Sequence, residues 1–381
     1  MSALRADVII VGGGIMGASS AFFLRQRGVS VILLERGLIG QQASGVNFGN
    51  TRRMGRPVDE LPLANRSREI WLKFKELFDG DAELLLNGHL RVGFTPAHEE
   101  RMAKYAQDAK DFGLDMQMLS AKALRERFPY LGPELTAGCY APHDGHANPR
   151  LAAPIIGRAA VREGAQVFEN TEIVAVEKEG EDFRVTAADG RVFRAPVALI
   201  TAGAWGNRIS TSFGEPVPMI AKVPHMCVTE PVPYAIGPTT GAMADVFEQV
   251  VFFRQVARGN IVIGGGGHEL ADIESRRAYV NPSRTLYKLA NAPRVVPAFK
   301  NLNIIRVWGG IEGYMEDGRS VMGPSARVPG LYYAFGFSGE GFQLGPGVGD
   351  VMAELIHTGR TSTPIEHYHI SRFAKLAAQA A

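Results

Sequence analysis

The feature that most constrains this chain is a strand, a glycine-rich turn and a helix at its N-terminal end. Residues 8–11 form a short apolar run, and a G-x-G-x-x-G spacing begins at Gly12. A helical pattern then leads to a second apolar run, 29–34, which Glu35 follows. Such glycines allow a tight turn and close approach of a pyrophosphate, the helix N-terminus attracts the phosphates, and the acid can bind a ribose. The pattern predicts a dinucleotide site; an ordinary strand–helix–strand unit with a glycine turn is the alternative.

Composition limits the other classes. The chain has 381 residues, 46% hydrophobic and 21% charged, which indicates a globular protein of two domains, or three at most. Its 41 basic and 39 acidic side chains create no strong field for nucleic acid or an anionic membrane. Two cysteines cannot form a disulfide framework or a metal cluster. No apolar run reaches the ~20 residues of a membrane span, and no signal peptide precedes the first strand, so we expect a cytoplasmic protein.

A long polar loop follows the acid of this unit. Residues 37–56 read GLIGQQASGVNFGNTRRMGR and have no clean helical period. A loop of this length is costly to order unless something binds along it. The pattern favours a loop that lines a bound ligand, with a solvated surface loop as the alternative.

Two later apolar strands also run into glycines. Residues 197–201 are followed by AGAW at 202–205, and residues 331–335 are followed by GFSGEGFQLGP at 336–346. A helical pattern continues over 348–356. Backbone N–H groups at such a join can face an anion.

These segments, with GGGIMG near the N-terminus, Glu35-Arg36 and the loop around Ser44, resemble the D-amino-acid oxidase superfamily. The resemblance extends over almost the entire chain and implies FAD-dependent oxidation of amines. No histidine occurs in 148–153, so by the resemblance we expect no covalent FMN here. No cysteine occurs between residues 306 and 318, which excludes a thioether to the flavin from that loop, so we expect the FAD to be non-covalent. The residues that the resemblance places beside FAD are Gly12, Gly14, Ile15, Met16, Glu35, Arg36, Ala43, Ser44, Asn47, Phe48, Gly49, Ile173, Ala202, Gly203, Trp205, Gly336, Gly339, Gly341, Phe342 and Gln343.

The expected fold class is α/β. A Rossmann-type FAD-binding domain is joined by a second, α+β substrate domain built on a mostly antiparallel sheet. The predicted pieces are 1–85, 145–217 and 300–381 for the discontinuous FAD-binding domain, and 86–144 and 218–299 for the substrate domain. The strands predicted in the later substrate piece are 223–229, 246–256 and 260–264.

The stretch 137–150 is predicted to be a loop. It contains His143, Asp144 and His146, which could suggest a metal site, but the turn chemistry of Asp-Gly explains the stretch equally well. The superfamily has a similar Asp-Gly stretch that leads into a helix, so we expect no metal.

The expected reaction moves a hydride from the α-carbon of an amine to flavin N5. Such a reaction needs orientation and exclusion of water rather than a strong nucleophile. The candidate catalytic residues are Arg52, Arg56, Arg254 and Glu340. A substrate carboxylate would favour a bidentate arginine. By the resemblance, the arginine that binds carboxylate in monomeric sarcosine oxidases aligns with Gly55, so this function has moved or the substrate differs. His225 is a further polar candidate on the predicted sheet.

The electron acceptor is the remaining question. The resemblance implies a lysine at the position of Gln343 in monomeric sarcosine oxidases, where its charge would stabilise a developing superoxide. Gln343 is neutral, so we expect oxygen to be a poor acceptor. The stretch NFGNTRRMGRPVDELPLANRSREIW most resembles β subunits of heteromeric opine, hydroxyproline, proline or sarcosine dehydrogenases. That resemblance implies an α-subunit partner, with electrons relayed through an FMN shared between the subunits or an iron–sulfur centre.

Two other functions stay open. One is a self-sufficient oxidase that releases hydrogen peroxide from glycine, sarcosine or a D-amino acid. The other is a non-catalytic FAD-binding subunit of a larger assembly. A nicotinamide-dependent dehydrogenase would leave the loop 37–56 and the segment 336–346 without a purpose.

Overall fold

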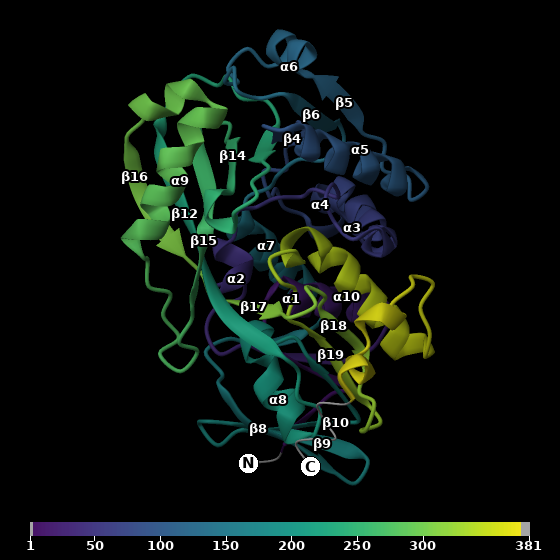
Figure 1. Ribbon diagram of the computed structural model, residues 1–381. Helices are drawn as coiled ribbons and strands as arrows, with labels where there is room; N and C mark the ends of the chain where they lie inside the picture. The colour runs from purple at the N-terminus through teal and green to yellow at the C-terminus, as the bar shows by residue number, and fades with distance from the viewer. Residues whose placement is uncertain (1–2, 375–381) are drawn as a thin grey trace.

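The computed structural model describes residues 3–374. A six-stranded sheet forms the lower half of the molecule in Figure 1 and contains the N-terminal dinucleotide unit. Adjacent strands of this sheet are parallel, except for the antiparallel pair β18 and β19. In spatial order its strands are β18 (Val321–Pro324), β19 (Leu331–Phe335), β11 (Val197–Ile200), β2 (Val8–Val11), β3 (Val31–Leu34) and β7 (Gln166–Phe168). Every residue of β2 and β3 is buried, as expected for parallel strands that are covered on both faces.

Helices cover one face of this sheet. They pack around α1 (Ile15–Gln26) and form the largest apolar core with the strands. The surrounding helices are α3 (Leu61–Leu72), α4 (Phe74–Phe78), α7 (Pro149–Arg162) and α10 (Gly341–Thr358). The opposite face packs on a four-stranded sheet, built in the order β1 (Leu4–Arg5), β10 (Val192–Ala195), β9 (Asp182–Ala187) and β8 (Ile173–Glu179).

A larger sheet occupies the upper half of Figure 1 and is antiparallel at every pairing except β13 with β4. Its strands in order are β16 (Ile304–Gly309), β12 (Met219–Pro231), β15 (Asn260–Leu270), β14 (Val251–Gln255), β13 (Thr239–Ala242), β4 (His89–Gly93), β6 (Ala137–Ala141) and β5 (Gln117–Ser120), with β17 (Glu312–Met315) also paired to β12. The helices of this half are α5 (Pro96–Lys110), α6 (Ala121–Arg127) and α9 (Pro282–Val295), and two short ones lie nearer the first sheet, α2 (Ala43–Val46) and α8 (Gly206–Ser212).

The predicted fold class is confirmed: the fold is mixed α/β, with a parallel sheet and a separate, mostly antiparallel one. Four local predictions need correction. Residues 137–141 form β6 rather than loop, because their backbone pairs with β4 on one side and with β5 on the other. The strand predicted over 246–256 is confined to β14, and that over 260–264 continues to Leu270. Pairing of β16 and β17 with β12 puts residues 304–315 on the larger sheet, although 300 was the predicted boundary.

The close approach of α10 to α1 depends on glycine. A Cβ on Gly349 would lie 2.2 Å from Ser19 Cβ and 2.6 Å from the Ser19 carbonyl carbon. Because the latter is backbone, one helix would have to move. We expect Gly349→Ala to lower the free energy of unfolding by about 1–3 kcal/mol, measured by urea denaturation. Gly237→Ala is the control, since a Cβ at Gly237 meets nothing within 4 Å; equal effects of both substitutions would contradict the packing argument.

Candidate functional site

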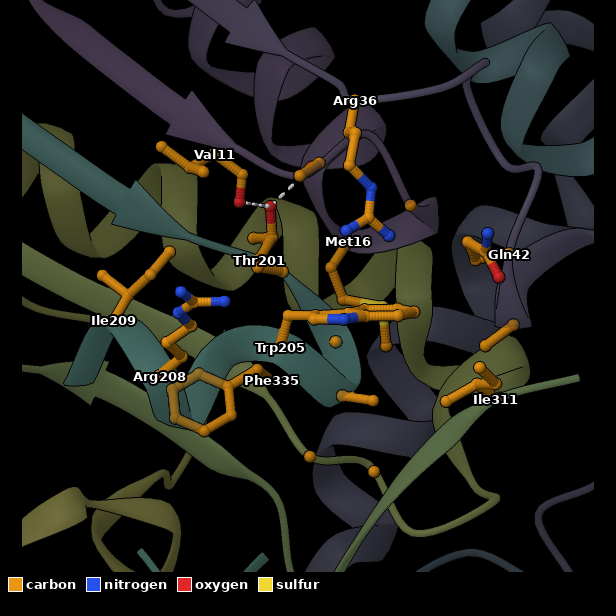
Figure 2. Close-up of a pocket in the computed structure, with 18 of the residues that line it drawn as sticks. Val11, Met16, Arg36, Gln42, Thr201, Trp205, Arg208, Ile209, Ile311 and Phe335 are labelled. Atoms are coloured by element: carbon orange, nitrogen blue, oxygen red, sulfur yellow. Dashed lines mark hydrogen bonds between the residues drawn. The ribbon is translucent and has the colours of Figure 1, made fainter. Parts of the chain in front are cut away.

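A cavity of about 560 Å³ opens at the carboxyl ends of the parallel strands. This is the edge at which open α/β sheets bind ligands. Its walls come from β2, β3, β11 and β19, from β8, and from residues 311–313 of the larger sheet. In Figure 2, Arg36 and Met16 reach toward the ring of Trp205 in the middle of the view, with Gln42 and Ile311 to the right and Arg208 and Ile209 to the left. The cavity is therefore elongated and is built by segments that are far apart in the sequence.

The glycine turn after β2 is held by side chains from elsewhere in the chain. The Glu35 carboxylate accepts hydrogen bonds from the backbone N–H of Gly13 (2.7 Å) and of Gly37 (2.7 Å). Ser44 Oγ accepts one from Ile15 N (2.9 Å), and Thr201 Oγ1 donates to the Gly12 carbonyl (2.7 Å). Loop 37–56, strand β3 and strand β11 thus converge on one turn.

Two helix N-termini face this cavity. Neither α1 nor α10 has a side-chain cap, and residues of both first turns line the walls. Free N–H groups at a helix N-terminus attract phosphate. A Cβ at Gly203, which has φ +54°, would meet no protein atom within 4 Å. The walls therefore fit a dinucleotide cofactor, with space and N–H donors for its phosphates.

The far end of the cavity is lined by charged side chains that are already paired. The Arg36 guanidinium lies 4.6 Å from the centre of the Trp205 ring. Burial, and then the nearby Arg276, lower the pKa of Arg36. Arg276 pairs with Glu172. The stacked arginine and indole provide a flat, cationic surface of the kind that an adenine or ribose contacts.

The structure brings together most of the residues predicted to contact FAD. All of them line the cavity except Phe48, Gly49 and Gln343. Gln343 is buried, and its Nε2 donates to the Ala64 carbonyl (2.9 Å), toward α3. A side chain in that position is not at the cavity surface, so its neutrality no longer argues for slow reaction with oxygen.

Phe48 and Gly49 are instead held by Arg254. Arg254 Nε donates to the Phe48 carbonyl (2.7 Å), and its guanidinium lies 5.4 Å from the Phe48 ring centre. Gly49 has φ +84°, and a Cβ there would lie 2.9 Å from Arg254 Nη2. Burial lowers the pKa of Arg254 to about 10. Arg254 thus supports loop 37–56 and does not project into the cavity.

Arg52, Arg56 and Glu340 form one ionic cluster beside the start of α10. Arg52 Nη2 lies 2.5 Å from one Glu340 carboxylate oxygen, and Arg56 Nη1 lies 3.2 Å from the other. Burial opposes ionisation of Glu340, but the two arginines outweigh it and hold its pKa below the ordinary value of 4.5. Glu60 lies 3.8 Å from Arg56, and burial raises its pKa to about 7. Both sequence-predicted arginines are thereby paired with carboxylates within the protein.

Sequence reasoning missed Arg91 on β4. Its guanidinium occupies the space above Gly55, where a Cβ would lie 2.6 Å from Nη2. Burial and the neighbouring Arg52 lower its pKa to about 10. Among residues 3–374, no hydrogen bond or ion pair engages the guanidinium of Arg91. The available signal in the sequence was Gly55, whose missing side chain leaves room for a group from another strand. In the structure this glycine has φ +80°.

Sequence reasoning also missed Glu312, which lies in the cavity wall on β17. The Tyr314 hydroxyl donates to Glu312 Oε2 (3.0 Å). Burial raises the pKa of Glu312 to about 7. The signal was an acid inside the small-residue run GGIEG, residues 309–313, where a solvated charge has no obvious place.

The histidine-rich stretch after β6 has a structural role. Asp144 accepts hydrogen bonds from the backbone N–H of Arg53 (2.8 Å) and Met54 (2.9 Å), and His146 Nδ1 lies 3.1 Å from Thr239 Oγ1. In the described part of the chain no group of three or more His, Cys, Asp or Glu side chains could hold a metal ion. His225 Nε2 contacts backbone atoms of Tyr279 and Asn281, away from the cavity walls.

The parallel sheet with its dinucleotide turn, roofed by an antiparallel sheet, defines a flavin-dependent oxidoreductase. The family model for FAD dependent oxidoreductases (DAO) matches residues 7–355, and the chain belongs to that family. Glycine oxidase of Geobacillus kaustophilus is 26% identical over 97% of both chains. One of the subunits of opine oxidase from Rhizobium meliloti is 24% identical over 97% of this chain and 98% of its own. The crystal structure of L-proline dehydrogenase from P. horikoshii superposes with a TM-score of 0.91, at 24% identity, over 98% and 99% of the two chains.

FAD is therefore the cofactor, and the protein is an oxidoreductase of amino-acid-derived amines that acts on a C–N donor. The resemblance to the D-amino-acid oxidase superfamily is confirmed. Within residues 3–374, no helix has the length and apolarity that a membrane span requires.

Glu35 allows a test of the cofactor site. Glu35→Ala removes the bond that Glu35 accepts from the glycine turn at Gly13 and the one that it accepts from Gly37, each to a charged acceptor and worth about 1.5–3 kcal/mol. We expect the dissociation constant of FAD, measured by fluorescence quenching on adding FAD to apoprotein, to rise at least about tenfold. Glu181→Ala, on an exposed turn between β8 and β9, is the control. An unchanged affinity in Glu35→Ala would show that the turn does not hold FAD.

The ionic cluster predicts a pH-dependent stability. Because the folded-state pKa of Glu340 lies below its ordinary value, Glu340 stabilises the fold above pH 4.5, and this contribution is lost as the pH falls through the lowered pKa. We expect Glu340→Gln to cost about 1–3 kcal/mol at pH 7, because two arginines lose their carboxylate, and much less below pH 4. Urea denaturation at both pH values measures this. Glu126→Gln, in an exposed pair with Lys122, should change little at either pH.

Proposed function

We propose that this chain is an FAD-dependent dehydrogenase subunit that oxidises the C–N bond of an amino-acid-derived amine of the opine, hydroxyproline, proline or sarcosine type. The observation that carries the proposal is the composition of the cavity wall. Part of the wall offers phosphate-binding turns, and another part offers Glu312, with the cluster of Arg52, Arg56 and Glu340 nearby but outside the wall. Bound FAD supplies the hydride acceptor. The protein's own residues bind the amine, orient its α-carbon and exclude water.

Arg91 is the arginine we assign to a substrate carboxylate. Arg52 and Arg56 already bind Glu340, and Arg254 supports the loop at Phe48. Arg91 keeps a guanidinium without a carboxylate partner in the described chain, and it lies over Gly55. By the resemblance described for the sequence, Gly55 takes the place of the carboxylate-binding arginine of monomeric sarcosine oxidases. A guanidinium from β4 thus replaces one from the loop at nearly the same place, and planar guanidinium suits bidentate binding of carboxylate.

The proposed partner is an α subunit that accepts electrons from the FAD. Support comes from two relatives whose names make them subunits of larger enzymes, one of opine oxidase and one of sarcosine oxidase. This chain matches both over most of their lengths. An FMN shared with that α subunit would be the electron relay. The FAD would be non-covalent, because no cysteine that could form a thioether with the flavin occurs between residues 306 and 318.

A self-sufficient oxidase is the second candidate. The match to glycine oxidase over 97% of both chains favours it, and the burial of Gln343 removes one argument against it. The two candidates differ in the fate of the reduced flavin.

Anaerobic reduction decides between them. The FAD-loaded chain is mixed with amino acids and opines, the flavin spectrum is recorded, and air is then admitted. We expect bleaching by a secondary or primary amine that persists in air and is reversed by an artificial electron acceptor. Rapid re-oxidation with hydrogen peroxide would establish the oxidase instead. If no amine bleaches the flavin, even with the co-expressed products of neighbouring genes, the proposed function is wrong.

Arg91 makes the substrate class testable. We expect Arg91→Met to raise KM for the amino acid that bleaches the flavin by about 10–100-fold, because a charge-assisted hydrogen bond is worth about 1.5–3 kcal/mol. For the matching amine that lacks the carboxylate, Arg91→Met should change KM little. Arg101→Met, an exposed arginine on α5, is the control. If both arginine variants keep the wild-type KM, the carboxylate binds elsewhere.

A further inference from the structure

One carboxylate in the cavity wall has no positive partner. The carboxylates of the wall are Glu35, Glu172, Glu177, Glu274 and Glu312. Backbone N–H groups satisfy Glu35, and arginines pair with Glu172, Glu177 and Glu274. Glu312 has only the Tyr314 hydroxyl within the described chain. The Glu312 side chain is half-buried, and a carboxylate that loses water without a charged partner is costly, so a missing cation is the simplest reason for it to be there.

Glu312 lies in the cavity wall beside the glycine segment that leads into α10. Its Oε2 lies 3.8 Å, and the Tyr314 hydroxyl 3.3 Å, from the point that a Cβ of Gly339 would occupy. Gly339 immediately precedes Glu340 and the N-terminus of α10. The carboxyl therefore lies beside the glycine segment and near Glu340 of the ionic cluster, on a strand that also packs against residues 203–205.

The surroundings of Glu312 raise the pKa of its carboxyl into the range in which it can exchange a proton near neutral pH. Tyr314 from β17, Glu340 from the glycine segment, Lys222 from β12 and His268 from β15 are the titratable groups around it. Lys222 is opposite Glu312 in the strand register, but its Nζ lies over the Tyr314 ring at 5.2 Å. Burial raises the pKa of Glu312 to about 7, and Glu340 contributes in the same direction.

We propose that Glu312 binds the positively charged nitrogen of the substrate and accepts its proton. This inference rests on the proposed function and names the substrate as a primary or secondary ammonium rather than an amide or an N-acyl compound. One N–H bond of the ammonium breaks and one O–H bond forms on the Glu312 carboxylate. The nitrogen keeps the electron pair, and no electron is transferred in this step. The neutral amine that results can then lose hydride from its α-carbon, whereas an ammonium cannot.

Glycine betaine tests the cation site without turnover, because its nitrogen has neither a proton nor a lone pair. Its uncharged counterpart is 3,3-dimethylbutanoate, which has a closely similar shape and the same carboxylate. Each is titrated into the FAD-loaded full chain, and the shift of the flavin absorption gives the dissociation constant. We expect wild type to prefer betaine, with an affinity that rises up to about tenfold between pH 6 and pH 8 as Glu312 ionises.

Glu312→Gln should lose both the preference for betaine and its pH dependence, while 3,3-dimethylbutanoate binds as in wild type. That retained binding shows that the variant is folded. Glu316→Gln, an exposed acid directly after the same strand, is the matched control and should behave as wild type. The inference is overturned if Glu312→Gln keeps the betaine preference and its pH profile, or if wild type shows no preference for betaine.

The outcome is separable from that of the proposed function. Glu312-dependent binding of betaine in a protein whose flavin no amine bleaches would leave the cation site standing and reject the dehydrogenase. Bleaching by an amine, with the betaine preference unaltered in Glu312→Gln, would keep the dehydrogenase and reject the role of Glu312.

Discussion

The structure depends on the close packing of α10 against α1. Both helices begin at the carboxyl ends of parallel strands, and both present an uncapped N-terminus to the same cavity. Gly345 and Gly349 allow the contact, because a Cβ at either position would lie within 2.6 Å of an atom of α1. Helix N-termini attract anions only within about their first turn. Bringing two of them together therefore concentrates phosphate-binding capacity where neither helix alone would provide it.

The same cavity joins two halves with different electrostatic roles. Toward Trp205 the charged groups are paired, and they provide surfaces for a cofactor. Near the N-terminus of α10, Glu340 lies between Arg52 and Arg56. Neither Arg91 nor Glu312 has an ion-pair partner of opposite charge among residues 3–374. A zwitterionic amino acid has a carboxylate and an ammonium. The two unsatisfied side chains are of opposite sign, and this complementarity connects the proposed substrate to the energetic cost of their burial.

Prediction from sequence succeeded for wall residues that lie at the end of a strand or in the turn or loop directly after it. The walls formed by Gly12, Glu35, Ser44 and Gly203 follow from strand and helix periodicity and from glycines at their joins. It was wrong for residues 137–141, because density of glycine, histidine and proline nearby suggested a loop, whereas pairing with β4 and β5 makes a strand. Strand pairing between distant segments is a tertiary event that local propensity does not encode.

The sequence by itself determined the cofactor class and the family, because a phosphate-binding turn needs particular residues at fixed spacing along one strand and helix. Only the tertiary structure decided which charged side chains are free. Arg52 and Arg56 are equal to Arg91 in sequence terms, yet both of them pair with the carboxylate of residue 340. The folded chain also decides that no cation forms an ion pair with Glu312 among residues 3–374, because the nearby Lys222 ammonium lies over the Tyr314 ring. Pairing of charges depends on distances between segments hundreds of residues apart, and those distances exist only in the folded chain.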